Sequence, residues 1–363
     1  MLEHFSSLDD PRRDHGKLHL LEDILALTIC AVICGADSFV AVEAFGHAKH
    51  DWLQRFLTLP NGIPSHDTIG ALFARLDPRQ FEHCFLAWVN AVFERTAGKV
   101  VAIDGKTLRR SYDRSCNKAA IHMVSAWATT NHLVLGQVQV AAKSNEITAI
   151  PRLLDVLDVS GCSVTLDAMG CQQDIAKQII DQQADYVLAV KGNQGSLFNE
   201  AQQCFTSVSD ADMSYCEIEE RAHGRVETRR YWMTEQIPWE FRRIQWKGLR
   251  SMGKVEATRT VNGKTSVECR YYISSLPADA ERLADAVRSH WGIENQMHWV
   301  LDVAFREDES RIRDGHAAAN MALVRRIALN LLKHDTSVKL GLANKRLKAG
   351  WDEVYLLKIL LQE

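Results

Sequence analysis

The sequence predicts a mixed α/β protein in which a sheet region lies between two helical regions. Three short β-rich runs follow one another in the middle of the chain, and helical and β-rich runs then alternate, which is the pattern of a mixed sheet with helices on its faces. The length of 363 residues exceeds that of one ordinary domain. With 46% hydrophobic and 25% charged residues, the composition is that of a soluble globular protein with a sizeable core.

The first 95 residues are expected to form a helical N-terminal domain. Ser65 and Asp67 are both suited to cap a helix, because a short polar side chain accepts a hydrogen bond from an N–H of the first turn. Pro78 fits the first turn of a later helix, where its missing N–H costs nothing. The helices expected from the apolar spacing cover residues 21–34, 39–56, about 65 onward, and 78–93.

Residues 96–194 are expected to hold the first part of the sheet core. Runs rich in β-branched residues predict the strands, and apolar residues at helical spacing predict the helices between the later strands. The expected strands cover residues 99–103, 121–129, 133–140, 162–166 and 186–190, with helices starting near residue 151 and covering residues 171–183.

A β-rich insertion is expected at residues 195–270, because short alternating runs there replace the regular exchange of helix and strand. Its expected elements are a helix over 196–205 and strands over 215–220, 227–234, 243–249, 255–260 and 267–274. The core is expected to resume at residues 271–335, with a long helix over 278–303 and a basic amphipathic helix over 317–333. Residues 336–363 are expected to form a helical tail.

The sequence argues against membrane insertion and secretion. The apolar run over residues 24–42 is the longest, but Asp37 interrupts it, so it is interpreted as a core helix. No basic segment with a cleavage site opens the chain, and the nine cysteines are scattered, as reduced thiols of a cytosolic protein would be. A cytoplasmic location is therefore expected.

Basic residues are concentrated in two regions although the net charge is −3. Residues 311–350 hold nine Lys or Arg against two acidic residues, and residues 221–250 hold eight against three. Local basic surface attracts phosphate whatever the total charge, and a solvated helix face explains the same pattern equally well.

Three acidic residues carry the chemistry that the sequence predicts. Asp104 and Asp167 follow the first and fourth expected strands, which are neighbours in a mixed sheet of this order. Two adjacent carboxylates repel each other unless a cation lies between them, and Mg²⁺ is the usual answer because it takes oxygen ligands. Glu294, on the long helix, is the candidate for a third ligand.

The segments around these acids resemble the three acidic motifs of DDE transposases of bacterial insertion sequences, in the group of the H-repeat-associated proteins. The segments are residues 101–107 (VAIDGKT), 165–170 (TLDAMG) and 290–295 (HWGIEN), with further familiar stretches at 143–151, 191–194 and 223–227. The resemblance implies a ribonuclease-H-like catalytic core interrupted by an antiparallel β insertion, and catalysis by Asp104, Asp167 and Glu294.

The same resemblance implies the reaction and its partners. Two Mg²⁺ ions, replaceable by Mn²⁺ and typically ~3.5–4 Å apart, would activate a water and stabilise the leaving 3′-oxygen. The freed 3′ end would then join target DNA. The expected partners are double-stranded DNA, as element ends and as target, and a second copy of the chain in a homodimer. The helical N-terminal domain would bind the DNA ends or make dimer contacts. A bacterial, nucleoid-associated protein is implied.

Residues expected to contact DNA lie near the acids and in the insertion. Arginines interleaved with tryptophans in the insertion suit phosphate contact and stacking on an unpaired base. The expected contacts are Lys106, Arg109, Lys191, Asn193, Arg221, Arg225, Arg229, Trp246, Arg288, His290 and His298. Related transposases carry Tyr, Arg and Lys at fixed offsets around the Glu, where this sequence has Val287, His290 and Leu301.

Simpler interpretations remain beside these. Asp104-Gly105 is also a hairpin-turn signal, Asp167 is also suited to cap a helix, and histidines and tryptophans are more often core residues than ligands. Two other functions are also compatible with the sequence. One is a zinc metallohydrolase that uses the stripe of His290, Glu294 and His298 with Asp302, and the other is a non-catalytic DNA-binding descendant of a transposase.

Overall fold

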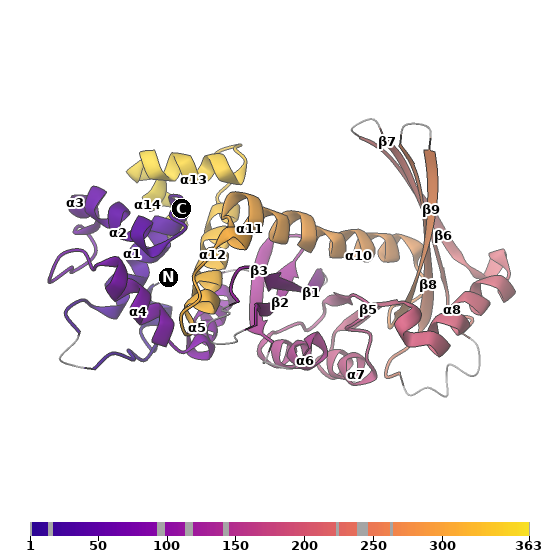
Figure 1. Cartoon of the computed structure of the whole chain (residues 1–363). Coiled ribbons are helices and arrows are strands. Elements are labelled where there is room, and N and C mark those ends of the chain that lie inside the picture. Colours follow the sequence, from indigo (N-terminus) through magenta and orange to yellow (C-terminus); the bar gives the residue numbers. More distant parts are fainter. Residues whose placement is uncertain are drawn as a thin grey trace.

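A computed structural model of the chain describes residues 2–13, 17–92, 99–112, 119–140, 145–222, 225–237, 246–261 and 264–362. Helices from both ends of the chain gather on one side, a twisted sheet occupies the middle, and four long strands stand at the far side (Figure 1). A single long helix runs from the long strands across the sheet to the helical side.

The helical side combines the N-terminal helices with the last helices of the chain. Residues of α1, α4, α5, α12 and α14 share one hydrophobic core, in which Ile29, Phe73 and Leu329 are fully buried. The helices are η1 (Leu2–Phe5), α1 (Leu21–Ile33), α2 (Phe39–Ala48), α3 (His50–Leu53), α4 (His66–Arg75), α5 (Pro78–Val92), α12 (Ala317–His334), α13 (Leu342–Trp351) and α14 (Glu353–Leu361).

Helix starts on this side follow the capping rules. The Ser65 side chain accepts a hydrogen bond of 3.3 Å from Thr68 N–H at the start of α4, which confirms Ser65 as the cap. The single helix expected over residues 39–56 is wrong, because Lys49 leaves the helical conformation and divides it into α2 and α3. The break lets α3 turn Trp52 into the core.

The core strands have the order expected of a ribonuclease-H-like fold. The sheet runs β3-β2-β1-β4-β5, with β1 antiparallel to β2, β2 antiparallel to β3, and β4 parallel to both β1 and β5. The strands are β1 (Val100–Leu108), β2 (Ile121–Ala128), β3 (Leu133–Gln139), β4 (Ser163–Leu166) and β5 (Asp185–Val190).

Helices cover both faces of this sheet, and β1 alternates between them. Val101 and Ile103 face α6 (Glu146–Val156) and α7 (Gln173–Asp181), whereas Val100 and Ala102 belong to the cores on the opposite face. Because side chains alternate along a strand, Asp104 belongs with Val100 and Ala102, on the face covered by α10 (Ala280–Ile293).

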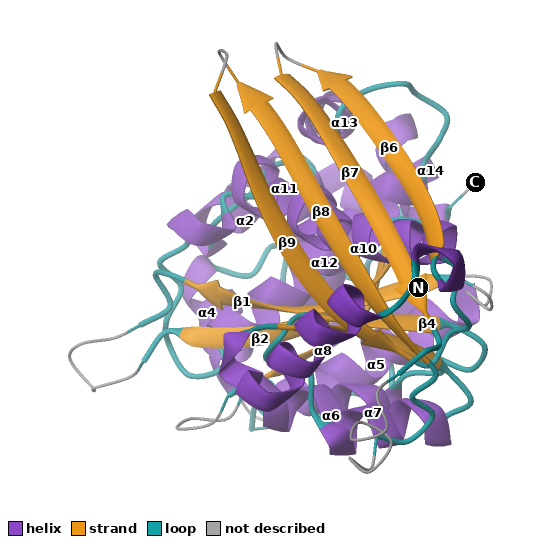
Figure 2. Cartoon of the chain, turned by 90° about the vertical axis from the view of Figure 1, so that its right-hand side faces the viewer, coloured by secondary structure: helices purple, strands orange, loops and turns teal. Residues whose placement is uncertain are grey.

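The insertion extends the core sheet. Its four strands pair antiparallel in the order β9-β8-β7-β6, and β9 also pairs with β5, so that all nine strands form one sheet (Figure 2). The elements are α8 (Gly195–Ser207), β6 (Ser214–Ala222), β7 (Arg225–Thr234), β8 (Ser251–Val261) and β9 (Lys264–Ser274). The strand expected over 243–249 is wrong in its described part, where residues 246–250 form a turn; residues 243–245 lie outside the described residues.

The long helix that crosses the sheet contains a π-helical turn. After α10 the five residues of η5 (Glu294–His298) are π-helical, and α11 (Trp299–Ala304) continues in the ordinary α form. A short 3-10 turn, η6 (Glu307–Glu309), then leads to α12. Among the described helices, none has the length and apolar character needed to cross a membrane.

Candidate active site

Strand register places the first two acids side by side. In the parallel pair of β1 and β4, Ile103 is the partner of Leu166, so Asp104 and Asp167 are the next residues on two adjacent strands. Adjacent strands lie roughly 4.8 Å apart. The sequence expected β1 to end at Asp104, and this is wrong, because β1 continues to Leu108 on its pairing with β2. β4 does end at Leu166.

The third acid reaches the same place from α10. Asp104, Asp167 and Glu294 all line one cavity of about 180 Å³, together with Lys191, Arg270 and Trp291. Glu294 is exposed and begins the π-helical turn, a form of helix that occurs frequently at functional sites. Three segments that are far apart in the sequence therefore each contribute one carboxylate to the same cavity.

Negative charge is concentrated around Asp104. The pKa of Asp104 is raised to about 7, chiefly by burial and in addition by the nearby carboxylates of Glu146, Asp167 and Glu294. Asp167 is held differently, since its Oδ1 accepts hydrogen bonds from the N–H groups of Met169 (2.9 Å) and Gly170 (3.2 Å). This turn fixes the Asp167 carboxylate directly after β4.

The three carboxylates are suitable ligands for a hard divalent cation, although in this structure they do not come close enough together to bind one ion. Carboxylate oxygens are the ligands that Mg²⁺ and Mn²⁺ prefer. Within the described ranges, no three Asp, Glu, His or Cys side chains are grouped closely enough to hold a metal ion as they stand. This finding applies equally to Asp104, Asp167 and Glu294 and to the alternative zinc stripe of His290, Glu294 and His298.

Two histidines expected to contact DNA are turned inward. His298 Nδ1 lies 3.5 Å from Asp104 Oδ2, and His290 Nδ1 lies 3.0 Å from the hydroxyl of Thr165. Burial lowers the pKa of His298 to about 3 and that of His290 to about 4. Both rings are neutral at pH 7, so neither offers a positive charge to a phosphate. A contact by charge is therefore not expected of either ring, whereas a hydrogen bond to DNA stays a prediction for His290, which lines the acidic cavity.

Glu146 is a fourth acid, near enough to Asp104 to raise the pKa of that carboxyl but not part of the cavity lining, and sequence reasoning assigned it no role. Its Oε1 lies 2.7 Å from His122 Nε2, and His122 Nδ1 lies 2.8 Å from the Thr107 hydroxyl. The carboxylate sits where a Cβ on Gly105 would be, so only glycine next to Asp104 admits it. The signal in the sequence is the DG pair, which was interpreted as a possible turn.

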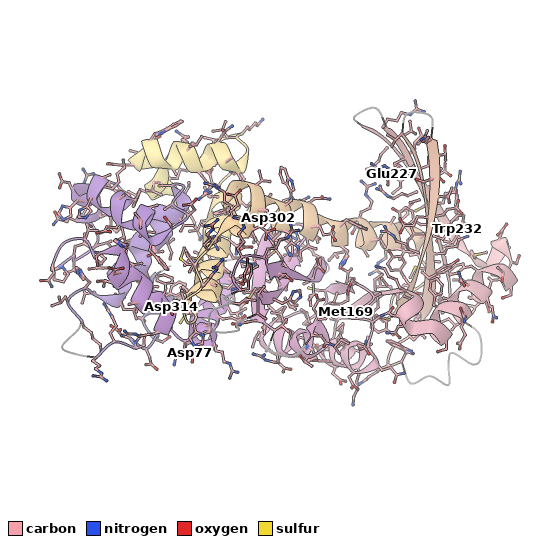
Figure 3. The ribbon with its side chains drawn as sticks, viewed as in Figure 1. Asp77, Met169, Glu227, Trp232, Asp302 and Asp314 are labelled. Carbon is pink, nitrogen blue, oxygen red and sulfur yellow. The ribbon has the colours of Figure 1, made fainter. Side chains whose placement is uncertain are left out.

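Lys106 belongs to an interior charge network. Its ammonium group pairs with Asp302, which lies on α11 (Figure 3), and is 3.3 Å from Glu307 Oε2. Glu307 is buried and also pairs with Arg326 at 2.9 Å. Lys106 is therefore not a DNA contact in this structure. Arg109, in contrast, is exposed, and it pairs with Asp308 at 3.1 Å.

The basic C-terminal region is also partly interior. Arg325, Arg326, Lys345 and Arg346 are all buried. Lys345 donates to the carbonyl oxygen of Leu332 (2.9 Å), and Arg346 donates to that of Val32 (2.7 Å). These four cations hold helices together, and the interpretation of the whole run as a DNA surface is wrong for them.

The residues of the insertion that were expected to contact DNA also include both buried and exposed side chains. Trp246 is buried in the core and cannot stack on a base. Arg229 is half-buried between Glu220 and Glu227, whereas Arg221 and Arg288 are exposed with acidic partners. Trp232, on β7 (Figure 3), is half-buried beside Lys254. The side chain of Arg225 lies outside the described residues.

A second hollow of about 600 Å³ continues the acidic cavity along the insertion. Arg270, Trp291 and Glu294 line both, and Arg259 lines the second. The Arg270 guanidinium lies 4.7 Å from the ring centre of Trp291, which is 41% exposed. Sequence reasoning missed Arg259, Arg270 and Trp291, because their neighbourhood exists only once β9 pairs with β5.

Loop residues at the end of the core sheet complete the site. Lys191 is exposed and lines the acidic cavity. Asn193 is also exposed, and its amide donates to the carbonyl oxygen of Ala168 at 3.2 Å, which ties the loop after β5 to the loop after β4. Lys191 therefore lies beside the acids, whereas the side chain of Asn193 joins two loops.

This fold and this acidic site define a protein of the DDE transposase class, and comparison with known families agrees. The family described as Transposase DDE domain matches residues 95–331, and DDE_Tnp_1-associated matches residues 2–89. The chain belongs to the DDE transposase family, whose members in general use divalent metal ions.

Relatives share almost the full length of the chain. YncI of Escherichia coli O157:H7 is 44% identical over 99% of this chain and 94% of its own length. The H repeat-associated protein YhhI of E. coli strain K12 is 42% identical over 99% of this chain and 97% of its own. A piggyBac transposase synaptic complex with hairpin DNA aligns with 96% of this chain and 76% of its own, at 11% identity and a TM-score of 0.43, too distant to carry an argument.

Proposed function

We propose that this protein is a DNA transposase that cuts phosphodiesters at the ends of an insertion sequence and joins the freed 3′ ends to target DNA. The observation that carries the proposal is the meeting of Asp104, Asp167 and Glu294 in one cavity at the end of β4. Family membership supports the same chemistry.

The three acids would hold the divalent ions, which when bound activate a water and stabilise the leaving oxygen. The residues of the chain then have distinct tasks. Lys191 and Arg259 are exposed in the lining of the two hollows and would bind the DNA backbone. His298, neutral and 3.5 Å from Asp104, would orient that carboxylate.

Single substitutions test the acids. Asp104→Asn, Asp167→Asn and Glu294→Gln remove one charge each with little change in shape, so each is expected to abolish cleavage while the protein stays folded. Asp285→Asn is the matched control, since Asp285 is exposed on α10 and lies outside the cavity. The substrate is the DNA that flanks the gene, with Mg²⁺ or Mn²⁺, and nicks are mapped on a sequencing gel. Cleavage at the wild-type rate by an acid variant would remove that residue from the mechanism.

Two further measurements separate the remaining alternatives. Stoichiometric zinc in the purified protein would favour a metallohydrolase, and restoration of cleavage by Mg²⁺ after chelation favours the transposase. DNA binding without cleavage by the wild-type protein under all metal conditions would favour a non-catalytic descendant. We also propose a homodimer, because two element ends must be paired, and light scattering with and without DNA tests it.

A further inference from the structure

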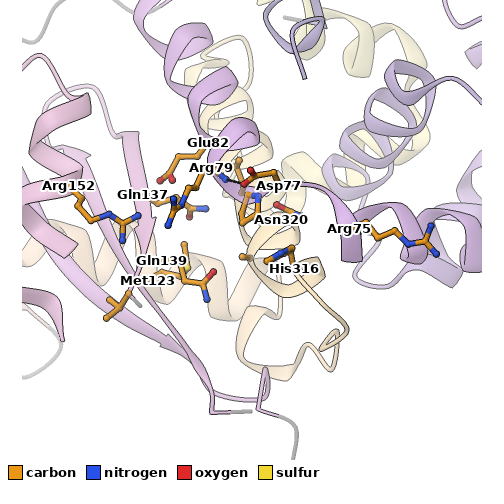
Figure 4. Close-up of a pocket in the computed structure, with 14 residues that line it drawn as sticks. Arg75, Asp77, Arg79, Glu82, Met123, Gln137, Gln139, Arg152, His316 and Asn320 are labelled. Carbon is orange, nitrogen blue, oxygen red and sulfur yellow. Dashed lines mark hydrogen bonds between the residues drawn. The ribbon is translucent and has the colours of Figure 1, made fainter. Parts of the chain in front are cut away.

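A third cavity, of about 480 Å³, shares none of its lining residues with the acidic site. It lies where α5, α6 and α12 meet the edge of the core sheet at β2 and β3 (Figure 4). Gln137 and Gln139 line it from the same face of β3, since they are two residues apart on one strand. Neither family resemblance nor the proposed cleavage chemistry gives this cavity a task.

Three buried acceptors in the cavity wall lack hydrogen bonds. Gln137 is 3% exposed and Asn320 is fully buried, yet Gln137 Oε1, Asn320 Oδ1 and Glu82 Oε1 accept no hydrogen bond from any described group. The orientation of Asn320 is fixed, because its amide nitrogen donates to the carbonyl oxygens of Phe73 (2.8 Å) and Leu76 (2.9 Å). A buried acceptor without a hydrogen bond is unfavourable, so this wall is suited to a ligand that carries hydrogen-bond donors.

Two guanidinium groups stand at the rim of the same cavity. Arg79 and Arg152 are exposed, and neither forms an ion pair among the described residues. Burial raises the pKa of the Glu82 carboxyl to about 8, and the nearby Arg152 and Arg79 oppose that rise. In Figure 4 these two arginines lie on the side of Gln137 and Glu82, whereas Arg75 lies apart. The rim therefore offers two positive charges to an anion.

We propose that this cavity binds one nucleotide unit whose base carries an exocyclic amino group. The two hydrogens of that amino group would be donated to acceptors among Glu82, Gln137 and Asn320, and the phosphate would lie against Arg79 and Arg152. Side-chain amides and carboxylates are the groups that recognise adenine and cytosine edges. Apolar lining residues, Met123, Val140 and Leu323, would contact the ring. The volume is within the usual range for small-ligand sites, roughly 300–1,000 Å³.

Isothermal titration of the full-length protein tests the chemistry of the ligand. The probes are dAMP, dCMP, dTMP, deoxyadenosine and inorganic phosphate. We expect dAMP or dCMP to bind roughly tenfold more tightly than dTMP, which has no amino group. Loss of the phosphate in deoxyadenosine should weaken binding by a similar factor of roughly ten. Absence of nucleotide binding, equal binding of dAMP and dTMP, or phosphate alone binding as tightly as dAMP would overturn the proposal.

Variants test the location of the site. Arg79→Gln and Arg152→Gln should each weaken dAMP binding, with Arg55→Gln, another exposed arginine without a described partner, as the matched control. Gln137→Leu should also weaken binding, but it should not lower the Tm, because it removes a buried acceptor that has no donor. Wild-type affinity in all three variants would place any binding elsewhere and overturn the assignment.

Competition identifies the source of the nucleotide. A short oligonucleotide with an unpaired adenosine end that displaces dAMP would identify a unit of a DNA strand as the ligand. Competition by mononucleotides alone would identify a free nucleotide, and both results support the site. A blunt, fully paired duplex that competes as well as the unpaired end would contradict the proposal, because its base edges are occupied. Asp104→Asn should bind dAMP normally, so the site and the proposed cleavage can fail independently.

Discussion

Gly105 leaves the space beside β1 that the Glu146 carboxylate occupies. A Cβ at this position would overlap the Glu146 carboxylate and the His122 ring. Gly105→Ala is therefore expected to lower the free energy of unfolding by about 1–3 kcal/mol, the usual cost of forcing extra volume into a packed site. The effect runs against the ordinary preference for alanine over glycine in a strand. Urea denaturation measures it.

A double variant tests whether steric overlap with the Glu146 carboxylate causes this loss of stability. Gly105→Ala with Glu146→Ala should recover much of the lost stability, because the overlapping carboxylate is gone; strictly additive losses would contradict this explanation. Gly292→Ala is the matched control. No atom lies within 4 Å of a Cβ at Gly292 in α10, so this change should raise stability by about 0.5–1 kcal/mol.

The acids illustrate what residue-level reasoning from the sequence could reach. Asp104 and Asp167 were placed side by side from strand order alone, and the register confirms it. Glu294 was predicted from its motif, and it lines the same cavity. Lys106 and Trp246 were interpreted as DNA contacts and are buried instead. A basic or aromatic side chain has the same sequence signal whether it meets DNA, a buried carboxylate or the core.

At the scale of elements, a buried charge network joins β1, α12 and the turn after α11. Glu307 is fully enclosed, and burial alone would raise its pKa, but Arg326, Lys106 and Arg325 lower it to about 2. Because the folded pKa lies below the unfolded value of about 4.3, Glu307 stabilises the protein above that value. The contribution is lost as the pH falls from about 4.3 to 2.

Glu307→Gln should lower the free energy of unfolding at pH 7 by about 3–5 kcal/mol, since it leaves buried arginines unpaired. The difference from wild type should shrink steadily below pH ~4.3. Denaturation at a series of pH values measures it. Glu309→Gln, an exposed acid of the same turn, should cost less than about 1 kcal/mol. A penalty for Glu307→Gln that stays constant down to pH ~2 would contradict the network's role.

Element prediction from the sequence succeeded where the local pattern decides the structure. The five core strands and the long helix near residues 278–303 were all expected, and they are present. The pattern could not show that β1 continues to Leu108, because that extension depends on pairing with β2. It could not show the π-helical turn either, since only the six residues of α11 follow that turn, too few to reveal a shift in the apolar spacing.

At the scale of the whole molecule, the net charge of −3 conceals a division of its cations into two groups. One group, including Arg326, Lys345 and Arg346, is buried and holds helices together. The other, including Lys191 and Arg259, is exposed along the acidic cavity and its continuation on the insertion. Counts of basic residues along the chain could not separate the two groups, because the separation depends on the tertiary fold.

This division predicts which cations govern DNA binding. Phosphate contacts release counterions, so the logarithm of the affinity should fall linearly with the logarithm of salt concentration. Lys191→Gln and Arg259→Gln should each reduce that slope by about 1, and Arg282→Gln, exposed on α10 but outside both hollows, should leave it unchanged. Fluorescence anisotropy with duplex DNA at several salt concentrations measures the slopes. A slope near zero for the wild-type protein would argue against DNA as the substrate, and equal slopes in all variants would move the DNA path away from the acids.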